Sequence, residues 1–489
     1  EIGEMDFDQV KEKSRLRWND ELNKIKIEGS TGRQDTVFYT ALYRTLLFPR
    51  KLYELNDEQQ PIYYSPYDGE LHEGVMLTDN GFWDTFRAVH PFFTLMYPDF
   101  SSEYLQSLVN AYNESGWLPH WSSPGHRDIM IGDHAASLFA DAYVKGIQDW
   151  DVNTAYEAMV KEVNNEHPRY TDIGREEATE YNQLGYVPYP KYMEGTAKTL
   201  EYAYNDWNVA VMADSLGKQE DAEYYYQRSQ NYKNVWDIET MFMRGRTESG
   251  EWHEPFNPIA WGGEFVEGNA WHYLWSVFHD TEGLIKLMGG RESFLAKMDS
   301  VFSMPPVYEI GTYDKVIHEI TEMVIANMGQ YAHGNQPIQH MIYLYNYAGK
   351  PWKTQKWVRH AMDSLYGPGP DGLCGDEDNG QTSAWYVFSA MGFYPVTPGH
   401  PSYVFGSPLF SKITLQLPNE KQFVVEAANN SAHNKYIQSV KLNGKDYHKT
   451  WISHFDIING GNLVFKMGPE PNETWGKTVD AAPYSMSLN

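Results

Sequence analysis

Cysteine, basic residues and long apolar runs are scarce in this chain, and each scarcity excludes a class of protein. The one cysteine, Cys374, cannot support an internal disulfide framework. No apolar run reaches the ~18 residues that a membrane-spanning helix needs, and the mean hydropathy is -0.58. Lys and Arg total 39 against 66 Asp and Glu, a net charge of -27 that repels phosphate backbones. We therefore expect a soluble chain without a transmembrane segment and without a nucleic-acid partner.

Four familiar motifs are also broken or missing. GPGPDG at 367–372 matches a dinucleotide-binding pattern, but its two prolines remove amides that a pyrophosphate needs. HEITE at 318–322 ends in glutamate where the zinc protease motif has histidine. DEDNG at 376–380 lacks the glycine of an EF-hand loop, and no G-x-S-x-G elbow occurs. A dinucleotide-binding site, a zinc protease, an EF-hand calcium site and a serine hydrolase are therefore disfavoured.

Aromatic residues are abundant, and helical periodicity dominates most of the chain. The 36 Tyr and 16 Trp suit a sugar-binding site, although a tyrosine-rich core explains many of them equally well. From Phe7 to about Gly392 the spacing of apolar residues predicts antiparallel helix pairs, which favour a ring with one funnel-shaped face. The predicted helices lie at 7–26, 36–48, 81–96, 101–115, 133–147, 152–164, 196–215, 219–234, 268–280, 291–302, 337–348, 352–365 and 381–391.

Two regions depart from this helical pattern. Residues 166–190, rich in Tyr, Gly and Pro, indicate a long ordered loop. Past about Pro398, alternating β-branched residues predict a small β unit, with a hairpin turn at Asn443-Gly444. The chain is therefore expected to combine a large helical part with a small C-terminal sheet.

The stretch LCGDEDNGQTSAWY, residues 373–386, places three acids on a turn before a predicted helix. A solvated loop whose acids complement the helix N-terminus is one explanation. A site for a hard cation, or a carboxylate pair that handles a proton, is the other. Further acids and amides stand at similar loop-to-helix junctions, so that they can converge on one face of a ring: Asp79, Asp84, Glu264, Glu267, His318, Glu319, Asn335 and Gln336.

Six separated blocks resemble the signature of glycoside hydrolase family 92, the calcium-dependent exo-α-mannosidases: NGFWDTFR, GWLPHW, TLEYAYNDW, EGNAWHYLWSVFHD, HGNQPIQH and GDEDNGQTSAWYVFSAMGFYPVTPG. They occur in the order of the family, from about residue 8 to the C-terminus. The resemblance implies a mainly α fold, an (α/α)6 toroid with a small C-terminal β unit. It divides the chain into a linker helix at 1–30, the catalytic ring at 31–398 and a β-rich unit packed on the ring at 399–489.

The resemblance also implies hydrolysis with inversion and gives roles to three acids. Glu267 in EGNAW matches the general acid, and Asp376 and Asp378 in GDEDNG match the carboxylates that activate water. Such an enzyme needs a proton donor with a raised pKa on one side of the sugar and an ionised base on the other. Glu377, between the two aspartates, is expected to point elsewhere.

A calcium ion that binds O2 and O3 of the sugar is implied by the same resemblance. Oxygen donors close to the matching blocks are the candidate ligands: Glu322, Asn335, Gln336 and Asp378. The candidate substrate contacts are Trp83, Asp84, His272, His318 and Glu319. The pair His318-Glu319 resembles that of members selective for α-1,2-linked mannose, whereas His272 stands where many members carry glutamine.

The implied substrates are mannose-containing glycans of the N-glycan or yeast-mannan type, and the implied location is the periplasm or the exterior of a bacterial cell. Members normally carry a β-sandwich domain before the ring, and we expect that domain to be missing here. Two alternatives stay open on the residues alone. One is another enzyme on a helical ring, a glucoamylase-like hydrolase or a polysaccharide lyase. The other is a non-catalytic glycan-binding protein, which would need no opposed acid and base.

Overall fold

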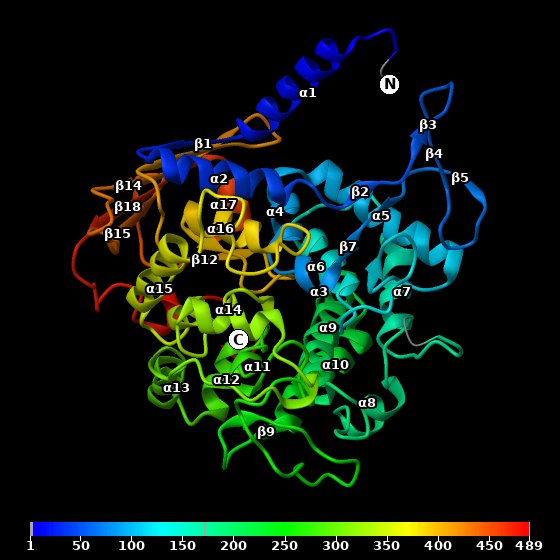
Figure 1. Ribbon diagram of the computed structural model, residues 1–489, viewed down its shortest axis with the longest axis vertical. Coiled ribbons are helices and arrows are strands. Elements are labelled where there is room, and N and C mark those ends of the chain that lie inside the picture. Colours follow the sequence, from blue (N-terminus) through cyan, green and yellow to red (C-terminus); the bar gives the residue numbers. More distant parts are fainter. Residues whose placement is uncertain (1–2, 171–172, 489) are drawn as a thin grey trace.

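The computed structural model describes residues 3–170 and 173–488, and the chain is mainly helical, as predicted (Figure 1). Its α-helices are α1 (Phe7–Leu22), α2 (Gly32–Thr45), α3 (Phe82–Thr85), α4 (Val89–Met96), α5 (Pro98–Ser115), α6 (Ala135–Val144), α7 (Val152–Glu162), α8 (Ala178–Leu184), α9 (Gly195–Ser215), α10 (Gln219–Arg228), α11 (Ala270–Tyr273), α12 (Thr281–Leu287), α13 (Arg291–Ser303), α14 (His318–Ala326), α15 (Pro351–Ser364), α16 (Gln381–Met391) and α17 (His454–Ile458).

The strands are short except in the C-terminal region. They are β1 (Ile25–Glu28), β2 (Arg50–Lys51), β3 (Glu54–Leu55), β4 (Pro61–Tyr64), β5 (Leu71–Glu73), β6 (Leu77–Thr78), β7 (Asn80–Gly81), β8 (Trp121–Ser122), β9 (Trp236–Asp237), β10 (Phe242–Met243), β11 (Phe393–Tyr394), β12 (Ser402–Phe405), β13 (Lys412–Gln416), β14 (Gln422–Ala428), β15 (Tyr436–Leu442), β16 (Lys445–Tyr447), β17 (Trp451–Ser453) and β18 (Gly461–Gly468).

Short helices account for most differences from the predicted elements. The predicted loop at 166–190 contains α8, and α14 was not predicted. Both helices have fewer than ten residues, which is less than the window over which helical periodicity can be recognised. The predicted helix at 337–348 is instead 3₁₀ structure, at Gln336–Ile338 and Met341–Asn346.

The C-terminal strands form a sheet of six, in the order β1-β13-β14-β18-β15-β16. The predicted hairpin joins β15 to β16, and Asn443 and Gly444 adopt the positive φ values that its turn requires. The edge strand β1 comes from the N-terminal segment and pairs antiparallel with β13. The expectation of a helix alone at 1–30 is therefore incomplete, because four residues of that segment complete this sheet.

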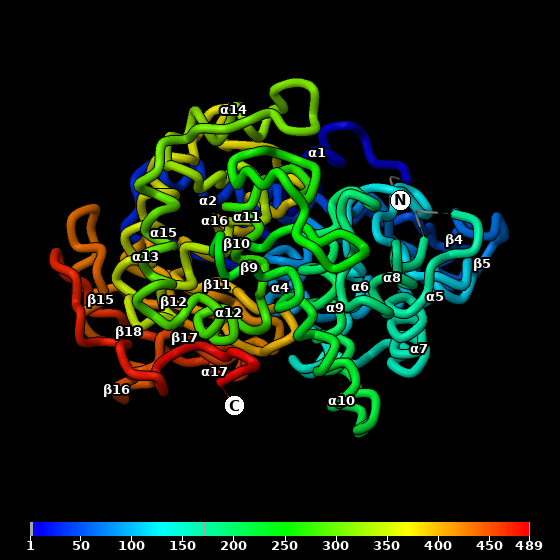
Figure 2. The backbone as a smooth tube through the Cα atoms, turned by 90° about the horizontal axis from the view of Figure 1, so that it is seen from below, coloured from blue at the N-terminus to red at the C-terminus, as the bar shows by residue number. Residues whose placement is uncertain are grey.

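The six-stranded sheet lies at one side of the molecule and the three-stranded sheet β3-β4-β5 at the other, with the helices between them, in both Figure 1 and Figure 2. The helix α1 begins with a capping box between Asp6 and Gln9, and none of its residues is buried. It projects from the body beside the N-terminus (Figure 1). Among the residues described, no helix combines the length and apolar character needed to cross a bilayer.

Two helices, α9 and α16, run through the interior. Every residue of α16 is buried, and in α9 burial extends to the charged side chains of Glu201 and Asp206. Asp206 accepts hydrogen bonds from Arg175 and Arg228 at 2.9 and 2.8 Å, so that this buried charge is paired. The loop that enters α16 carries the aspartates singled out in the sequence.

Candidate active site

Three acids from distant parts of the sequence share one electrostatic environment. Asp84 lies in α3, Glu267 precedes α11 and Asp378 precedes α16. Burial raises the pKa of Asp84 well above its usual range, and the charges of Asp378 and Glu267 raise it further, while Arg87 opposes them. Only 3% of Asp84 is exposed, and its carboxylate has no hydrogen-bond or ion-pair partner among the described residues. The fold thus leaves Asp84 available to a polar ligand.

Backbone contacts hold the segment around Asp84 against the loop that carries Asp378. The N–H of Gly81 donates to the side-chain oxygen of Asn379 at 3.0 Å, and the N–H of Ala88 donates to that of Gln381 at 2.9 Å. Asp378 and Asn379 both have left-handed backbones, with φ of 52° and 51°. Strained backbone of this kind persists only where the surroundings fix it, and it is frequent at functional sites.

Glu267 has the environment of a proton donor. Burial raises its pKa to about 8, and the charges of Glu319 and Asp378 contribute to the rise. Its backbone N–H donates to the hydroxyl of Tyr313 at 2.6 Å. The amide group of Asn335 donates to the carbonyl of Glu267 at 2.9 Å and to its carboxylate at 3.2 Å. The side chain is therefore both protonated near neutral pH and held in one orientation.

The two predicted base residues differ in their surroundings. Asp378 accepts a short hydrogen bond from the amide of Gln336, and burial raises its pKa to about 6. The side chain of Asp376 is 69% exposed, and its carboxylate lies 3.9 Å from Nε2 of His318. Glu377 turns to the start of α16, where it accepts hydrogen bonds from the N–H of Gly380 and the hydroxyl of Ser383, both at 2.9 Å. Stabilisation of the start of α16 thus explains the presence of an acid at Glu377, but it does not explain Asp376 or Asp378.

A group of metal-ligating atoms lies beside Asp376. Donor atoms of His318, Glu322 and Asp376 all lie within 4.8 Å of one another. One carboxylate oxygen each of Glu319 and Glu322, and the side-chain oxygen of Gln336, are buried without a hydrogen-bond partner among the described residues. Unpaired buried oxygens are costly unless a ligand or water completes them. This donor set suits a hard cation.

Two glycines allow this close approach. A Cβ on Gly334 would lie 2.8 Å from the Glu322 carboxylate and 2.8 Å from the Cys374 carbonyl, and one on Gly375 would lie 2.3 Å from the Gly334 carbonyl. The loops before Asn335 and Asp376 therefore pass at backbone contact distance beside Glu322. Larger residues at either position would separate the loops.

Two predicted substrate contacts lie in the interior of the described structure. Trp83 is only 1% exposed and belongs to the hydrophobic core, with its backbone carbonyl accepting a hydrogen bond from Arg87. His272 is 2% exposed, and its Nδ1 accepts the N–H of Asn269 at 3.1 Å to cap α11. Burial lowers the pKa of His272 to about 3. Both side chains pack inside this chain, and their contact with a substrate stays a prediction.

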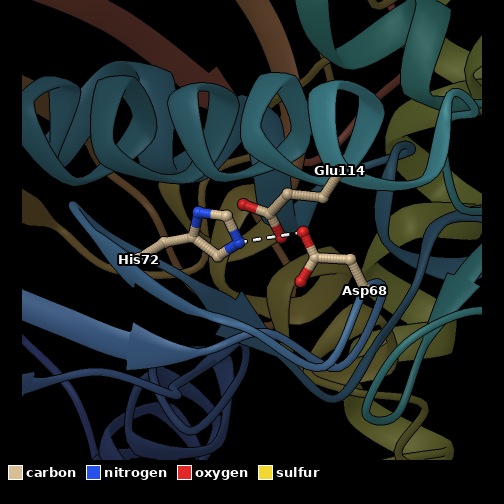
Figure 3. A group of neighbouring side chains, drawn as sticks. All are labelled: Asp68, His72 and Glu114. Carbon is tan, nitrogen blue, oxygen red and sulfur yellow. Dashed lines mark hydrogen bonds and ion pairs between the residues drawn. The ribbon is translucent and has the colours of Figure 1, made fainter.

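Two further groups of His, Asp and Glu lie elsewhere. Figure 3 shows His72 facing Asp68, with Glu114 of α5 beside them. Nε2 of His72 lies 2.9 Å from a carboxylate oxygen of Asp68. Glu114 is already occupied, because the hydroxyls of Tyr63 and Ser65 donate to its two oxygens. These contacts account for the group as a link between the β4–β5 hairpin and α5.

The other group is fully buried and joins His120, Asp133 and Glu162. Burial alone would lower the pKa of His120, but its contacts with the two carboxylates outweigh burial and raise it to about 10. The imidazolium therefore balances these charges.

Some residues that shape the site carry no signal in the sequence. Tyr313 ends a short 3₁₀ helix, Gly311–Tyr313, that no motif marks, and Asn379 follows acids that attract more attention. Only their hydrogen bonds to Glu267 and Gly81 reveal what they do. Both hydrogen bonds join segments that are far apart in the chain.

Comparisons with known proteins identify the family of this chain. The profile of the glycosyl hydrolase family 92 catalytic domain matches residues 1–469. The structure of an inverting mannosidase of that family from Bacteroides thetaiotaomicron is 54% identical and has a TM-score of 0.94, over 100% of this chain and 66% of that one. A second structure from that organism, an α-mannosidase with mannoimidazole, is 34% identical with a TM-score of 0.91, over 99% of this chain and 63% of that one.

A curated relative from Arthroderma benhamiae, described as an uncharacterized secreted glycosidase, is 28% identical over 522 residues, which is 98% of this chain and 59% of the relative. The fold and the gathered acids thus define a glycoside hydrolase catalytic domain. The chain belongs to glycosyl hydrolase family 92. It spans less than two thirds of the length of these relatives.

Proposed function

We propose that the chain is the catalytic part of an exo-acting α-mannosidase that hydrolyses terminal mannose with inversion. The observation that carries the proposal is Glu267, a buried carboxyl whose pKa is raised to about 8 and which Asn335 orients toward a site shared with Asp84 and Asp378. A carboxyl that stays protonated near neutral pH can donate its proton to the leaving oxygen of a glycoside. Membership of family 92 supports the same chemistry.

Asp376 and Asp378 jointly activate the attacking water in this proposal. Asp378 is largely ionised at neutral pH, because its pKa is about 6. The exposed Asp376 supplies a second carboxylate two residues away. The water attacks opposite the leaving group while Glu267 protonates the departing oxygen, so that the configuration at the anomeric carbon inverts.

A Ca²⁺ ion fits the donor atoms beside this water. We assign its protein ligands to Glu322, Gln336 and Asp378, because the first two have buried unpaired oxygens and the third is in contact with Gln336. When bound, the ion would hold two hydroxyls of the sugar and favour a flattened ring. We do not include the predicted ligand Asn335 in this assignment. Its side-chain oxygen accepts the N–H of Gln336, and its side-chain nitrogen donates to Glu267.

Substrate recognition is assigned to three side chains. Asp84 is a buried acceptor without a protein partner, which suits a sugar hydroxyl. His318 is exposed and lies 3.1 Å from Glu319, which orients its ring. We propose that this pair contacts the leaving sugar and selects α-1,2-linked mannose, in glycans of the N-glycan or yeast-mannan type.

The domain arrangement is also part of the proposal. The interior helices α9 and α16 and the helices around them support an (α/α)6 ring at 31–398, with the segment 1–30 as a linker and 399–489 as a sheet unit packed on the ring. The greater length of the relatives agrees with an additional domain, which we propose to be an N-terminal β-sandwich. A periplasmic or secreted location agrees with the name of the secreted relative.

Release of mannose from α-1,2-mannobiose, followed by NMR of the first anomer, tests this function. We expect β-mannose first, and loss of the activity in EDTA with recovery in added Ca²⁺. A glucose-specific hydrolase, a lyase that leaves an unsaturated product, or a protein that binds mannobiose without cleaving it would contradict the proposal.

A further inference from the structure

The hydroxyl of Tyr313 carries a proton that the protein does not use, directly beside the proposed acid. Its oxygen accepts the backbone N–H of Glu267 at 2.6 Å, whereas its own proton has no acceptor among the described residues. The side chain is half-buried, and tyrosine hydroxyls in such places usually find a hydrogen-bond acceptor. A bound ligand can supply the acceptor that the chain lacks here.

The phenol of Tyr313 lies within electrostatic reach of three carboxylates. Burial raises its pKa most, the hydrogen bond from Glu267 opposes the rise, and the charges of Glu267, Glu194 and Glu319 add to it. Glu267 is the proposed acid, and Glu319 lies 3.1 Å from His318 in the pair proposed to contact the leaving sugar. Tyr313 is therefore close to both groups that act on the departing half of the substrate.

Glu194 stands at the start of α9 with a carboxylate that nothing engages. Its backbone is left-handed, with φ of 63°, and its side chain makes no capping hydrogen bond. The side chain is half-buried and has no hydrogen-bond or ion-pair partner in the described parts of the chain. Lys198, one turn further along, pairs instead with Glu176 and Glu177. A strained residue with an unused polar side chain is more typical of a functional position than of a structural one.

The loop before α11 contacts the segments that carry both residues. The N–H of Glu194 donates to the carbonyl of Gly263 at 2.6 Å, and the N–H of Gly263 donates to the hydroxyl of Thr312 at 2.8 Å. A Cβ on Gly262 would lie 2.4 Å from that hydroxyl and 2.9 Å from the ring of Tyr313. The start of α9 and the turn that ends at Tyr313 therefore both pack on the loop that leads to the proposed acid.

We propose that Tyr313 and Glu194 line the subsite of the leaving sugar, where the hydroxyl of Tyr313 donates a hydrogen bond to the sugar and the carboxylate of Glu194 accepts one. This inference rests on the proposed function, which places the leaving sugar beside Glu267 and His318. Each hydroxyl of a sugar can donate and accept, so a free donor and a free acceptor match it. Neither residue takes part in the chemical step, because both recognise the group that departs.

The affinities for two uncleaved ligands separate the two subsites. Mannoimidazole fills only the terminal-mannose site, whereas S-linked α-1,2-mannobiose also fills the leaving-sugar subsite. Calorimetry on the wild type, Tyr313→Phe and Glu194→Ala measures both affinities. The disaccharide should bind about three- to tenfold more weakly to Tyr313→Phe and about ten- to a hundredfold more weakly to Glu194→Ala, since hydrogen bonds to charged groups are stronger. The affinity for mannoimidazole should not change.

The ratio of the two affinities distinguishes sugar recognition by Tyr313 from mere support of Glu267. Tyr313→Phe also removes the acceptor of the Glu267 N–H, so its kcat on mannobiose is expected to fall in either case. If Tyr313 only supported the acid, the disaccharide would not be weakened relative to mannoimidazole. That result would overturn the assignment of Tyr313.

Glu194→Ala keeps the test decisive if Tyr313→Phe does not fold, because the Glu194 side chain makes no hydrogen bond or ion pair within the described structure. Its kcat/KM should fall on α-1,2-mannobiose and stay at the wild-type value on an aryl mannoside, whose leaving group has no sugar hydroxyls. Equal losses on the two substrates, or wild-type kinetics on mannobiose, would overturn the assignment of Glu194.

Two matched controls test whether such changes act by themselves. Tyr192→Phe removes the hydroxyl of another half-buried tyrosine, whose proton already goes to Glu180 at 2.6 Å. Glu420→Ala removes a glutamate with nearly the same left-handed backbone, φ of 64°, in the exposed turn between β13 and β14. Both variants should keep the wild-type ratio of affinities. A change in that ratio as large as those of Tyr313→Phe and Glu194→Ala would overturn the inference.

The same measurements distinguish a failure of this inference from a failure of the proposed function. A wild-type chain that binds both ligands but hydrolyses nothing would contradict the proposed catalysis alone, and selective weakening of the disaccharide would still support the subsite. A wild-type chain that binds neither ligand would overturn both proposals.

Discussion

The amide nitrogen of Asn335 donates to both the backbone carbonyl and the carboxylate of Glu267, at 2.9 and 3.2 Å. One side chain therefore fixes the backbone and the functional group of the same residue. Because Glu267 has a left-handed backbone, with φ of 45°, this support holds a conformation that the residue would otherwise leave. The contact also stabilises the ionised form of Glu267, and it lowers the pKa that burial raises.

Asn335→Ala should therefore change both the size and the pH dependence of catalysis. Without the hydrogen bond the pKa of Glu267 rises above about 8, so the alkaline limb of kcat/KM should move to higher pH. Because the Glu267 carboxyl would lose its fixed orientation, the maximum value of kcat/KM should fall by roughly ten- to a hundredfold. A pH-rate series on α-1,2-mannobiose, whose leaving group needs the proton, measures both effects. A downward shift of the alkaline limb would contradict this role.

Glu267→Gln removes the proton and keeps the shape of the side chain. Hydrolysis of mannobiose should fall by ~10²–10⁴, the usual contribution of general acid catalysis. Mannosides with good leaving groups should lose much less, because they need little protonation. Parallel assays on the two substrates measure the difference.

Glu264→Gln is the matched control for that variant. Glu264 lies three residues earlier, is 7% exposed, and has a pKa that burial raises to about 7. Its carboxylate accepts the N–H of Gly245 at 2.6 Å, and glutamine can still accept that bond. We expect its ratio of activities on the two substrates to equal that of the wild type. A Glu267→Gln enzyme with wild-type turnover on mannobiose would remove Glu267 from the acid role.

Glu322→Gln tests the cation site by a measurement that does not depend on activity. Replacing a carboxylate by an amide weakens a Ca²⁺ site, so the variant should need more Ca²⁺ to reach the same increase in melting temperature. Wild-type protein treated with EDTA should melt at a lower temperature and recover on addition of Ca²⁺. Equal Ca²⁺ titrations of variant and wild type would exclude Glu322 as a ligand.

Asp68→Asn provides the control for this titration. Asp68 belongs to the other exposed group of His, Asp and Glu, shown in Figure 3. Its partner His72 and the occupied Glu114 explain that group without a metal. The response to Ca²⁺ should therefore stay as in the wild type.

Much of this site could be predicted from the sequence because its acids stand in short motifs that keep their order along the chain. The helix α16 follows the acidic turn as predicted, and the hairpin at Asn443-Gly444 follows local turn preferences. The strand β1 was not predicted, because four residues form it only by pairing with β13, nearly 400 positions away. Its stability comes from the partner strand rather than from its own sequence.

The direction in which each side chain points could not be predicted from the sequence motifs. His272 lies five residues from Glu267 in the same block, yet it faces the interior because it caps α11. Asn335 stands beside oxygen donors in the sequence but points its amide at Glu267. A motif shows which residues are near one another, whereas the local backbone decides what each one faces.

The acidic turn gives the last prediction. If Asp376 and Asp378 jointly activate the water, alanine at either position should lower kcat strongly for every substrate, since water attack is needed whatever group departs. Glu377→Gln should stay near wild type, because Glu377 caps α16 and glutamine can retain a hydrogen bond there. Kinetics on mannobiose and on an activated mannoside compare the three variants.

The stereochemistry of the product provides an independent check on the same turn. A base that activates water opposite the leaving group must give β-mannose first, whereas a nucleophilic aspartate would give α-mannose through a covalent intermediate. NMR of the earliest product distinguishes the two, before the anomers equilibrate. Initial α-mannose, or a Glu377→Gln variant more impaired than both aspartate variants, would show that this turn does not work as a base. Initial α-mannose would favour a nucleophile at Asp378, the buried member of the pair, whose carboxylate is held by Gln336.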